Sequence, residues 1–179
     1  MNILALDLGT RTGWALAESG RIESGVQVFD VKRGESPGMR YLRFNRWLAE
    51  LYMRRTALET ILDCVVYEQT HHRGGAATEV ASGFATRVQE FCAARGIQHA
   101  AVHSATLKKF ATGKGHADKA GMAMAAKLRG WTADDDNEID ARWLLDYALV
   151  ELMPGGVDDY AVHVRVAKTF MAPPRPGAP

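Results

Sequence analysis

Apolar and polar residues are arranged in short blocks along the first part of the chain, and these blocks predict β-strands. Residues 2–8 form an apolar run, and residues 13–17 form a second run after a Gly-Thr-Arg-Thr turn. Residues 26–29 alternate with a period of two after a turn at 20–25. Turns this short join neighbouring antiparallel strands. The pattern therefore predicts a three-stranded antiparallel meander.

The spacing of apolar residues changes to that of helices after the Pro37-Gly38 break. Residues three or four positions apart share one face of a helix, so this spacing predicts amphipathic helices. The expected helices are a long one with Phe44, Leu48, Leu51, Leu58 and Leu62 on its buried face, one from Gly75 to Arg95, a short turn capped by Ser104 that runs through Lys109, one from Asp118 to Gly130, and one from Asn137 to Met153. Residues 63–68 and 98–102 are predicted to form two further strands. This order predicts an α/β fold with a mixed five-stranded sheet flanked by helices.

A single domain is expected over residues 1–170. The chain has 179 residues, which is enough to bury one sizeable core. Residues 171–179 are rich in proline and predict a disordered tail. No apolar run reaches the length of a membrane span, and no basic and apolar leader precedes the first strand, so we expect a cytoplasmic protein. Cys64 and Cys92 lack the spacing of a zinc site or a disulfide framework, which favours packed thiols.

Charge is unevenly distributed although the net charge is only +1. Six basic residues lie between Lys108 and Arg129, opposed only by Asp118, and five acidic residues follow between Asp134 and Asp140. Two solvated faces would give this pattern. It is also what a metal site facing a polyanion requires, because phosphates attract cations and metal ions attract carboxylates.

Acidic residues end two of the apolar strands, at Asp7 and Glu68. A carboxylate at the end of a buried strand costs several kcal/mol to desolvate unless a cation or hydrogen bonds compensate. In a mixed sheet both acids would emerge at the same edge, and a helix crossing that edge would add Asp140, with Asp136 and Asn137 one turn earlier. Oxygen ligands without a histidine or cysteine cluster suit Mg²⁺ or Mn²⁺. Two such ions, roughly 3.5–4 Å apart, are the usual arrangement for phosphodiester cleavage.

Each of these acids also has a purely structural interpretation. Asp7 could cap the turn after its strand, and Glu68 could be an ordinary acid at a strand end. Asp134 and Asp135 fit a solvated helix N-terminus, where acidic side chains interact favourably with the helix dipole. Asp140 is followed at once by the buried part of its helix, which argues against a purely solvated role for it.

Four motifs follow one another along the chain. They are Leu4-Ala5-Leu6-Asp7-Leu8-Gly9, Val66-Tyr67-Glu68-Gln69, Thr112-Gly113-Lys114-Gly115-His116-Ala117-Asp118-Lys119 and Asn137-Glu138-Ile139-Asp140-Ala141. In order and spacing they resemble the RuvC family of Holliday-junction resolvases, over residues 2–152, and the compact length resembles the phage-borne branch of that family. The resemblance implies a ribonuclease H-like fold. It also implies a homodimer that cuts two opposed strands of a four-way DNA junction with Mg²⁺ or Mn²⁺.

The resemblance also implies a set of metal ligands. Asp7, Glu68 and Asp140 match three of the family's metal-binding acids. The fourth position holds Asn137, where the family has Asp or His. Either its amide oxygen coordinates metal or Asp136 takes its place, and the sequence leaves this choice open.

Basic residues near the motifs become candidates for DNA contact. Lys108 and Lys119 match two lysines that the family places near the scissile phosphate, where a cation stabilises the charge of the transition state. The family often has a junction-opening aromatic residue in the loop after Glu68, and this chain has none there. Stacking by His71 or His72, or by another residue, would have to replace it. A solvated surface role is the alternative for each residue. Besides Lys119, the DNA-binding candidates are Lys108, Lys109, Lys114, His71, His72 and Arg73.

Three other functions compete with a junction resolvase. The segment Asp7-Leu8-Gly9-Thr10 resembles the first phosphate loop of actin-like ATPases and sugar kinases, which need a second such domain in a much longer chain. RuvC-related nucleases that act on RNA precursors are shorter and have a different last motif. A non-catalytic protein that binds branched DNA would explain the uncharged Asn137. The dimer is implied by the resemblance, and the helix from Gly75 to Arg95 is the candidate interface.

Overall fold

One mixed five-stranded sheet organises the part of the chain that the computed structural model describes, residues 1–56, 61–69, 75–133 and 135–152. Its strands are β1 (Ile3–Asp7), β2 (Arg11–Glu18), β3 (Arg21–Val28), β4 (Cys64–Glu68) and β5 (Gln98–Val102). They lie in the order β3-β2-β1-β4-β5. The first three strands form the expected antiparallel meander, and β4 runs parallel to both β1 and β5. The predicted α/β fold is confirmed.

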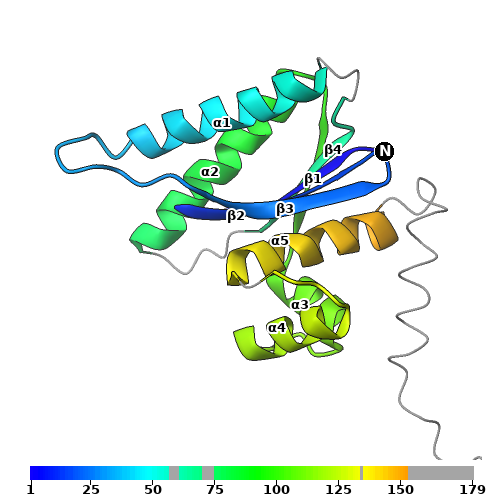
Figure 1. Ribbon diagram of the computed structural model, residues 1–179. Helices are drawn as coiled ribbons and strands as arrows, with labels where there is room; N and C mark the ends of the chain where they lie inside the picture. Colours follow the sequence, from blue (N-terminus) through cyan, green and yellow to red (C-terminus); the bar gives the residue numbers. More distant parts are fainter. Residues whose placement is uncertain (57–60, 70–74, 134, 153–179) are drawn as a thin grey trace, which may run out of the picture.

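Helices cover both faces of this sheet (Figure 1). They are α1 (Met39–Thr56), α2 (Ala76–Ala93), α3 (Ser104–Thr112), α4 (Lys119–Leu128) and α5 (Asp136–Tyr147), which continues into a π-helical turn, η1 (Ala148–Leu152). The helices α1 and α2 lie on one face, α5 lies on the other, and α3 and α4 pack beside α5. Among the described helices, none combines the length and the apolar content that crossing a bilayer requires.

The central strand β1 is buried on both faces, which explains its continuous apolar sequence. Successive side chains of a strand point to opposite faces. Ile3 and Ala5 therefore join the core beneath α5, whereas Leu4 and Leu6 join the core beneath α1 and α2, and all four are fully buried. Asp7 has the parity of Ile3 and Ala5, so the strand directs its carboxylate toward the side of α5.

The helix predictions were wrong at three places. Leu62 is buried, but it lies just before β4 and not on the long helix, because an apolar residue beside a strand can match helical spacing by chance. Ser104 is the first residue of α3, and the N-cap position belongs to His103, which forms no side-chain capping bond. The last helix changes to π-helical geometry at Ala148. Leu58 and the residues after Leu152, including the predicted domain end at 170 and the proline-rich tail, lie outside the described residues.

Candidate functional site

Acidic residues from three elements meet at one end of the sheet. The strands β1 and β4 pair in parallel with Leu6 beside Tyr67, so Asp7 and Glu68 follow at the same end. The helix α5 packs across β1 and β2 on the face to which Asp7 points, and Asp140 comes from its second turn. The sequence predicted this meeting from the two strand ends and from a helix that crosses the sheet edge.

A pocket of about 190 Å³ lies where these elements meet. It combines acids with lysines, and apolar side chains of α3, α4 and α5 form part of its wall. The lining residues are Asp7, Glu68, Ser104, Leu107, Lys108, Asp118, Lys119, Met122, Asp136, Ile139 and Asp140. Four of the five predicted metal-ligand candidates and two of the predicted lysines therefore share one pocket.

Burial and mutual repulsion disfavour ionisation of the acids in this pocket. Burial, and then the charges of Asp140 and Glu68, raise the pKa of Asp7 to about 8. Burial, and then the charges of Glu68 and Asp136, raise the pKa of Asp140 to about 6. The nearby cation of Lys119 lowers both pKa values but does not offset these effects. A bound cation would stabilise the ionised forms of these carboxylates, which burial and mutual repulsion otherwise disfavour.

The chemistry of these donors fits a hard divalent cation. The candidate ligands are carboxylate oxygens, partly withdrawn from water and repelling one another, which is the donor type that Mg²⁺ and Mn²⁺ prefer. Within the described ranges, however, no three His, Cys, Asp or Glu side chains form a group tight enough to hold a metal ion. The acids thus share a pocket without forming a complete ligand cluster.

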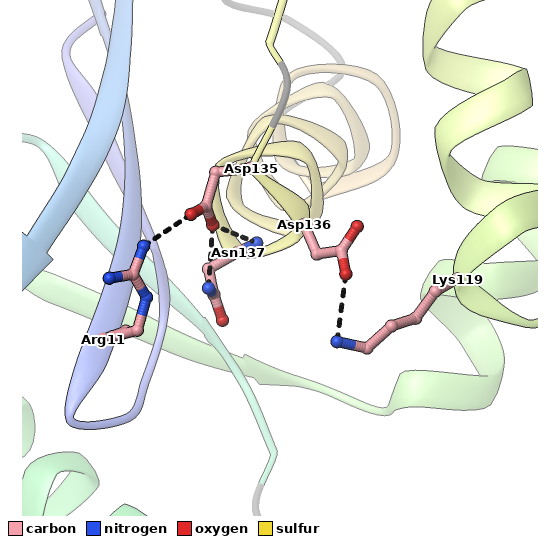
Figure 2. A network of polar contacts seen from close by, with 5 residues as sticks. All are labelled: Arg11, Lys119, Asp135, Asp136 and Asn137. Atoms are coloured by element: carbon pink, nitrogen blue, oxygen red, sulfur yellow. Dashed lines mark hydrogen bonds and ion pairs between the residues drawn. The ribbon is translucent and has the colours of Figure 1, made fainter.

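Lysines reach the pocket from α3 and α4. Asp118 caps α4 by accepting a hydrogen bond from the backbone N of Gly121 at 2.8 Å, and the helix begins at Lys119. The Nζ of Lys119 lies 3.1 Å from Oδ2 of Asp136 (Figure 2). Lys108, on α3, lines the same pocket.

Other DNA-binding candidates lie away from the pocket. Lys109 is exposed on α3 and Lys114 is exposed just beyond its end, and neither is among the described residues that line the pocket. His71, His72 and Arg73 lie outside the described residues.

The first turn of α5 separates the two candidates for a fourth ligand. Asp136 lines the pocket and points toward Lys119, whereas Asn137 turns toward Asp135 (Figure 2). The Oδ1 of Asp135 accepts hydrogen bonds from the backbone N of Asn137 at 2.9 Å and from its Nδ2 at 2.8 Å. The geometry thus favours Asp136 over Asn137 as a pocket ligand.

Asp135 lies at the N-terminus of α5, as expected for it, where it is the N-cap, and it also forms an ion pair with Arg11. Its Oδ2 accepts a hydrogen bond from Nη2 of Arg11 at 2.7 Å, across 124 residues of sequence. The Arg11 hydrogen bond, followed by those from Asn137, holds the pKa of Asp135 below its ordinary value. Asp134 lies outside the described residues.

Sequence reasoning missed the residues that hold α5 against the sheet. A Cβ atom at Gly13 would overlap the backbone carbonyl of Asn137, so α5 touches the backbone of β2 there. The hydroxyl of Ser24 in β3 donates a hydrogen bond to Glu138 at 2.6 Å. The one available signal was the glycine itself, because an isolated glycine in a strand often marks the close approach of another backbone.

Comparisons with known proteins identify the fold. No model of a known protein family matches the sequence, and no curated protein matches it. Among solved structures, Thermus thermophilus RuvC is 19% identical with a TM-score of 0.59, covering 80% of this chain and 90% of that one. T. thermophilus RuvC in complex with a Holliday junction substrate is 17% identical with a TM-score of 0.60 and the same coverage. At this identity the likeness establishes the fold, and the expected RuvC-like, ribonuclease H-like architecture is confirmed.

Proposed function

We propose that this protein is a structure-selective DNA endonuclease that resolves four-way (Holliday) junctions by paired phosphodiester cuts. The observation that carries the proposal is one pocket in which two lysines lie beside four carboxylates, not counting Asp118, which caps α4. These residues are Asp7, Glu68, Asp136, Asp140, Lys108 and Lys119. The RuvC-like fold supports the choice of substrate, since one of the similar structures holds a Holliday junction.

The four carboxylates are the proposed metal ligands. Asp7 and Glu68 project from adjacent strand ends, and Asp136 and Asp140 project from successive turns of α5. When bound there, two Mg²⁺ or Mn²⁺ ions would activate a water molecule and stabilise the leaving oxygen. Asp7 and Asp140 are partly withdrawn from water, which strengthens the attraction of their carboxylates for a cation. Asn137 is the less favoured ligand, because its side chain is turned toward Asp135 and it is not among the described residues that line the pocket, whereas Asp136 is.

The two lysines of the pocket would attract a phosphate group of the DNA. Lys119 and Lys108 place ammonium groups beside the carboxylates, where they would hold a phosphate and stabilise its additional charge in the transition state. Lys109 and Lys114, exposed at and after the end of α3, are proposed contacts to the neighbouring DNA backbone. His71, His72 and Arg73 follow Glu68 closely in sequence and are the proposed contacts to the junction centre.

A homodimer is part of the proposal because symmetric cutting of two opposed strands requires two active sites. The proposed interface is α2, which begins soon after the strand that carries Glu68. We place this enzyme in the cytoplasm, where its DNA substrate would be found.

The experiment that tests the proposed function compares three substrates in Mg²⁺ or Mn²⁺. They are a synthetic four-way junction, a linear duplex with the sequence of its arms, and a structured RNA precursor. The proposal predicts cuts in two opposed strands near the centre of the junction and no cutting of the duplex or the RNA. Junction binding without cleavage in either metal would indicate a non-catalytic branched-DNA-binding protein, and cleavage of the RNA alone would indicate an RNA-processing nuclease.

A further inference from the structure

The first turn of α5 is attached to the sheet through Asp135. This carboxylate uses both oxygens: Oδ1 accepts from the backbone N and from Nδ2 of Asn137, and Oδ2 accepts from Arg11 (Figure 2). An ionised carboxylate can only accept hydrogen bonds. The Asn137 side chain must therefore direct its NH₂ group, and not its amide oxygen, toward Asp135. Asp135 thus joins the start of α5 to the first residue of β2.

A second contact fixes the height of α5 above the sheet. Gly13 lies two residues after Arg11 on β2 and pairs with Asp7 of β1. The backbone of Asn137 rests directly on Gly13, where any side chain would overlap it. The same turn of α5 therefore contacts β2 at both Arg11 and Gly13, on the strand that neighbours Asp7.

A third contact ties this turn to the next strand. The hydroxyl of Ser24 in β3 donates to Oε1 of Glu138 at 2.6 Å, and both groups are partly buried. Residues 135, 137 and 138 thus point toward β2 and β3, whereas residues 136 and 140 line the pocket. At the start of α5, one side of the helix therefore contacts the sheet and the other side supplies carboxylates to the pocket.

We infer that Arg11, Asp135 and Asn137 form a positioning network that sets the place of Asp136 and Asp140 relative to Asp7. In this role Asn137 acts through its amide donor and not as a metal ligand. The inference rests on the proposed function, because the positions of these acids matter when they bind metal. Groups that orient metal ligands without touching the metal commonly affect metal affinity about 10–100-fold when they are removed.

The variant Asn137→Asp distinguishes a positioning role from a ligand role. As a ligand, an aspartate would add a charged oxygen and tighten Mn²⁺ binding. As a positioning residue, it would lose its donor and repel Asp135, which its Nδ2 now approaches to 2.8 Å. We expect Mn²⁺ affinity of the full chain, measured by titration calorimetry, to fall by about 10-fold. Tighter Mn²⁺ binding by Asn137→Asp would overturn the inference.

A double-mutant cycle tests the Arg11–Asp135 pair. Asp135→Asn keeps an acceptor for the backbone N of Asn137 but removes the charge that holds Arg11. We expect Arg11→Ala and Asp135→Asn each to weaken Mn²⁺ affinity about 10-fold, and the double variant to be no weaker than either, because both break one interaction. Arg11→Lys should restore most of the affinity. Additive losses in the double variant would overturn the pairing.

Cleavage kinetics separate positioning from direct DNA contact. A positioning defect lowers kcat and leaves KM for the junction unchanged, whereas loss of a phosphate contact raises KM. The matched control is Arg46→Ala, which removes an arginine ion-paired with Glu50 on α1 and changes the net charge equally. It should alter neither quantity. A raised KM with unchanged Mn²⁺ affinity in Arg11→Ala would make Arg11 a DNA contact instead.

Mn²⁺ binding also separates failure of this inference from failure of the proposed function. Wild-type protein that binds no Mn²⁺ would overturn both. Wild-type protein that binds Mn²⁺, with variants of Arg11, Asp135 and Asn137 that bind it equally well, would overturn the positioning network alone.

Discussion

Gly13 of β2 lies directly against the backbone carbonyl of Asn137, at the point where the first turn of α5 crosses the sheet. Gly13 is also the residue that pairs with Asp7 on β1. The absence of a side chain at this one position thus sets how closely the acids of α5 approach the acid of the central strand.

Gly13→Ala should displace α5 from the sheet. A methyl group that overlaps a backbone carbonyl cannot be accommodated by a side-chain rotation, so we expect a loss of stability of about 1–3 kcal/mol and weaker Mn²⁺ binding. Urea denaturation and titration calorimetry measure these effects. The control is Gly38→Ala, because a Cβ atom there would meet only the Ser36 hydroxyl, at 3.7 Å. Equal stability and Mn²⁺ affinity of Gly13→Ala and wild type would contradict the close approach.

Metal-free protein should lose stability as the pH rises from 5 to 8.5. The fold raises the pKa of Asp7 from 3.8 to about 8, so between these values the folded state holds a proton that the unfolded state has released. The contribution of Asp7 to the free energy of unfolding is fully present below pH 3.8 and is lost as the pH rises through 8. Asp140, whose pKa is raised to about 6, contributes with the same sign.

Asp7→Asn should therefore stabilise the metal-free protein at high pH. We expect the variant to exceed wild type by about 1–4 kcal/mol at pH 8.5 in EDTA, and by less at pH 5, in urea denaturation. The variant Asp30→Asn, which removes an exposed acid outside the pocket, serves as the control. Parallel pH profiles for wild type and Asp7→Asn would show that Asp7 is not held in a desolvated, repulsive environment.

Lys119→Ala should affect turnover more than DNA affinity. Removing a cation that stabilises charge developing on a phosphate commonly lowers the rate about 100–1,000-fold. Because Lys119 lies at the edge of the pocket, we expect a rate loss near the lower end of this range. Single-turnover cleavage and gel-shift titration measure the two quantities. Lys127→Ala, on the same helix but not among the described pocket residues, should change both little. Lower DNA affinity with unchanged turnover would indicate that Lys119 binds the DNA phosphate backbone and does not act in the cleavage step.

The ion pair between Arg129 and Asp146 should be essential to the α4–α5 contact. Its atoms lie 2.6 Å apart, and each side chain is only 9% exposed. Asp146→Ala leaves a buried guanidinium without its partner, which should cost about 3–5 kcal/mol in urea denaturation. Glu50→Ala, which breaks the exposed pair with Arg46 on α1, should cost less than about 1 kcal/mol. Similar costs for the two variants would refute this assignment.

The sheet and the acidic pocket could be predicted because they depend on local sequence. The strands β1 and β4 are apolar runs that each end in an acid, and parallel pairing brings such ends together. The antiparallel meander followed from short turns alone. Where an apolar residue lies beside a strand, as Leu62 does, periodicity alone assigned it to a helix, because spacing does not report what a residue packs against.

The details of α5 could not be predicted, because they depend on contacts between distant segments. Arg11 and Asp135 are 124 residues apart in sequence. The choice between Asp136 and Asn137 depends on how α5 is rotated about its axis, and contacts with β2 and β3 set that rotation. A neighbouring pair of polar residues at a helix start does not reveal which of the two faces the pocket.

The most direct test of the central claim is cleavage of a four-way junction by wild type and by Asp7→Asn in Mg²⁺, with the 5′ ends of the products analysed. We expect wild type to make paired cuts in opposed strands that leave ligatable 5′-phosphates. We expect Asp7→Asn to bind the junction with similar affinity and not to cut it. Wild-type protein that binds the junction without cutting it, or Asp7→Asn that cuts as fast as wild type, would contradict the account.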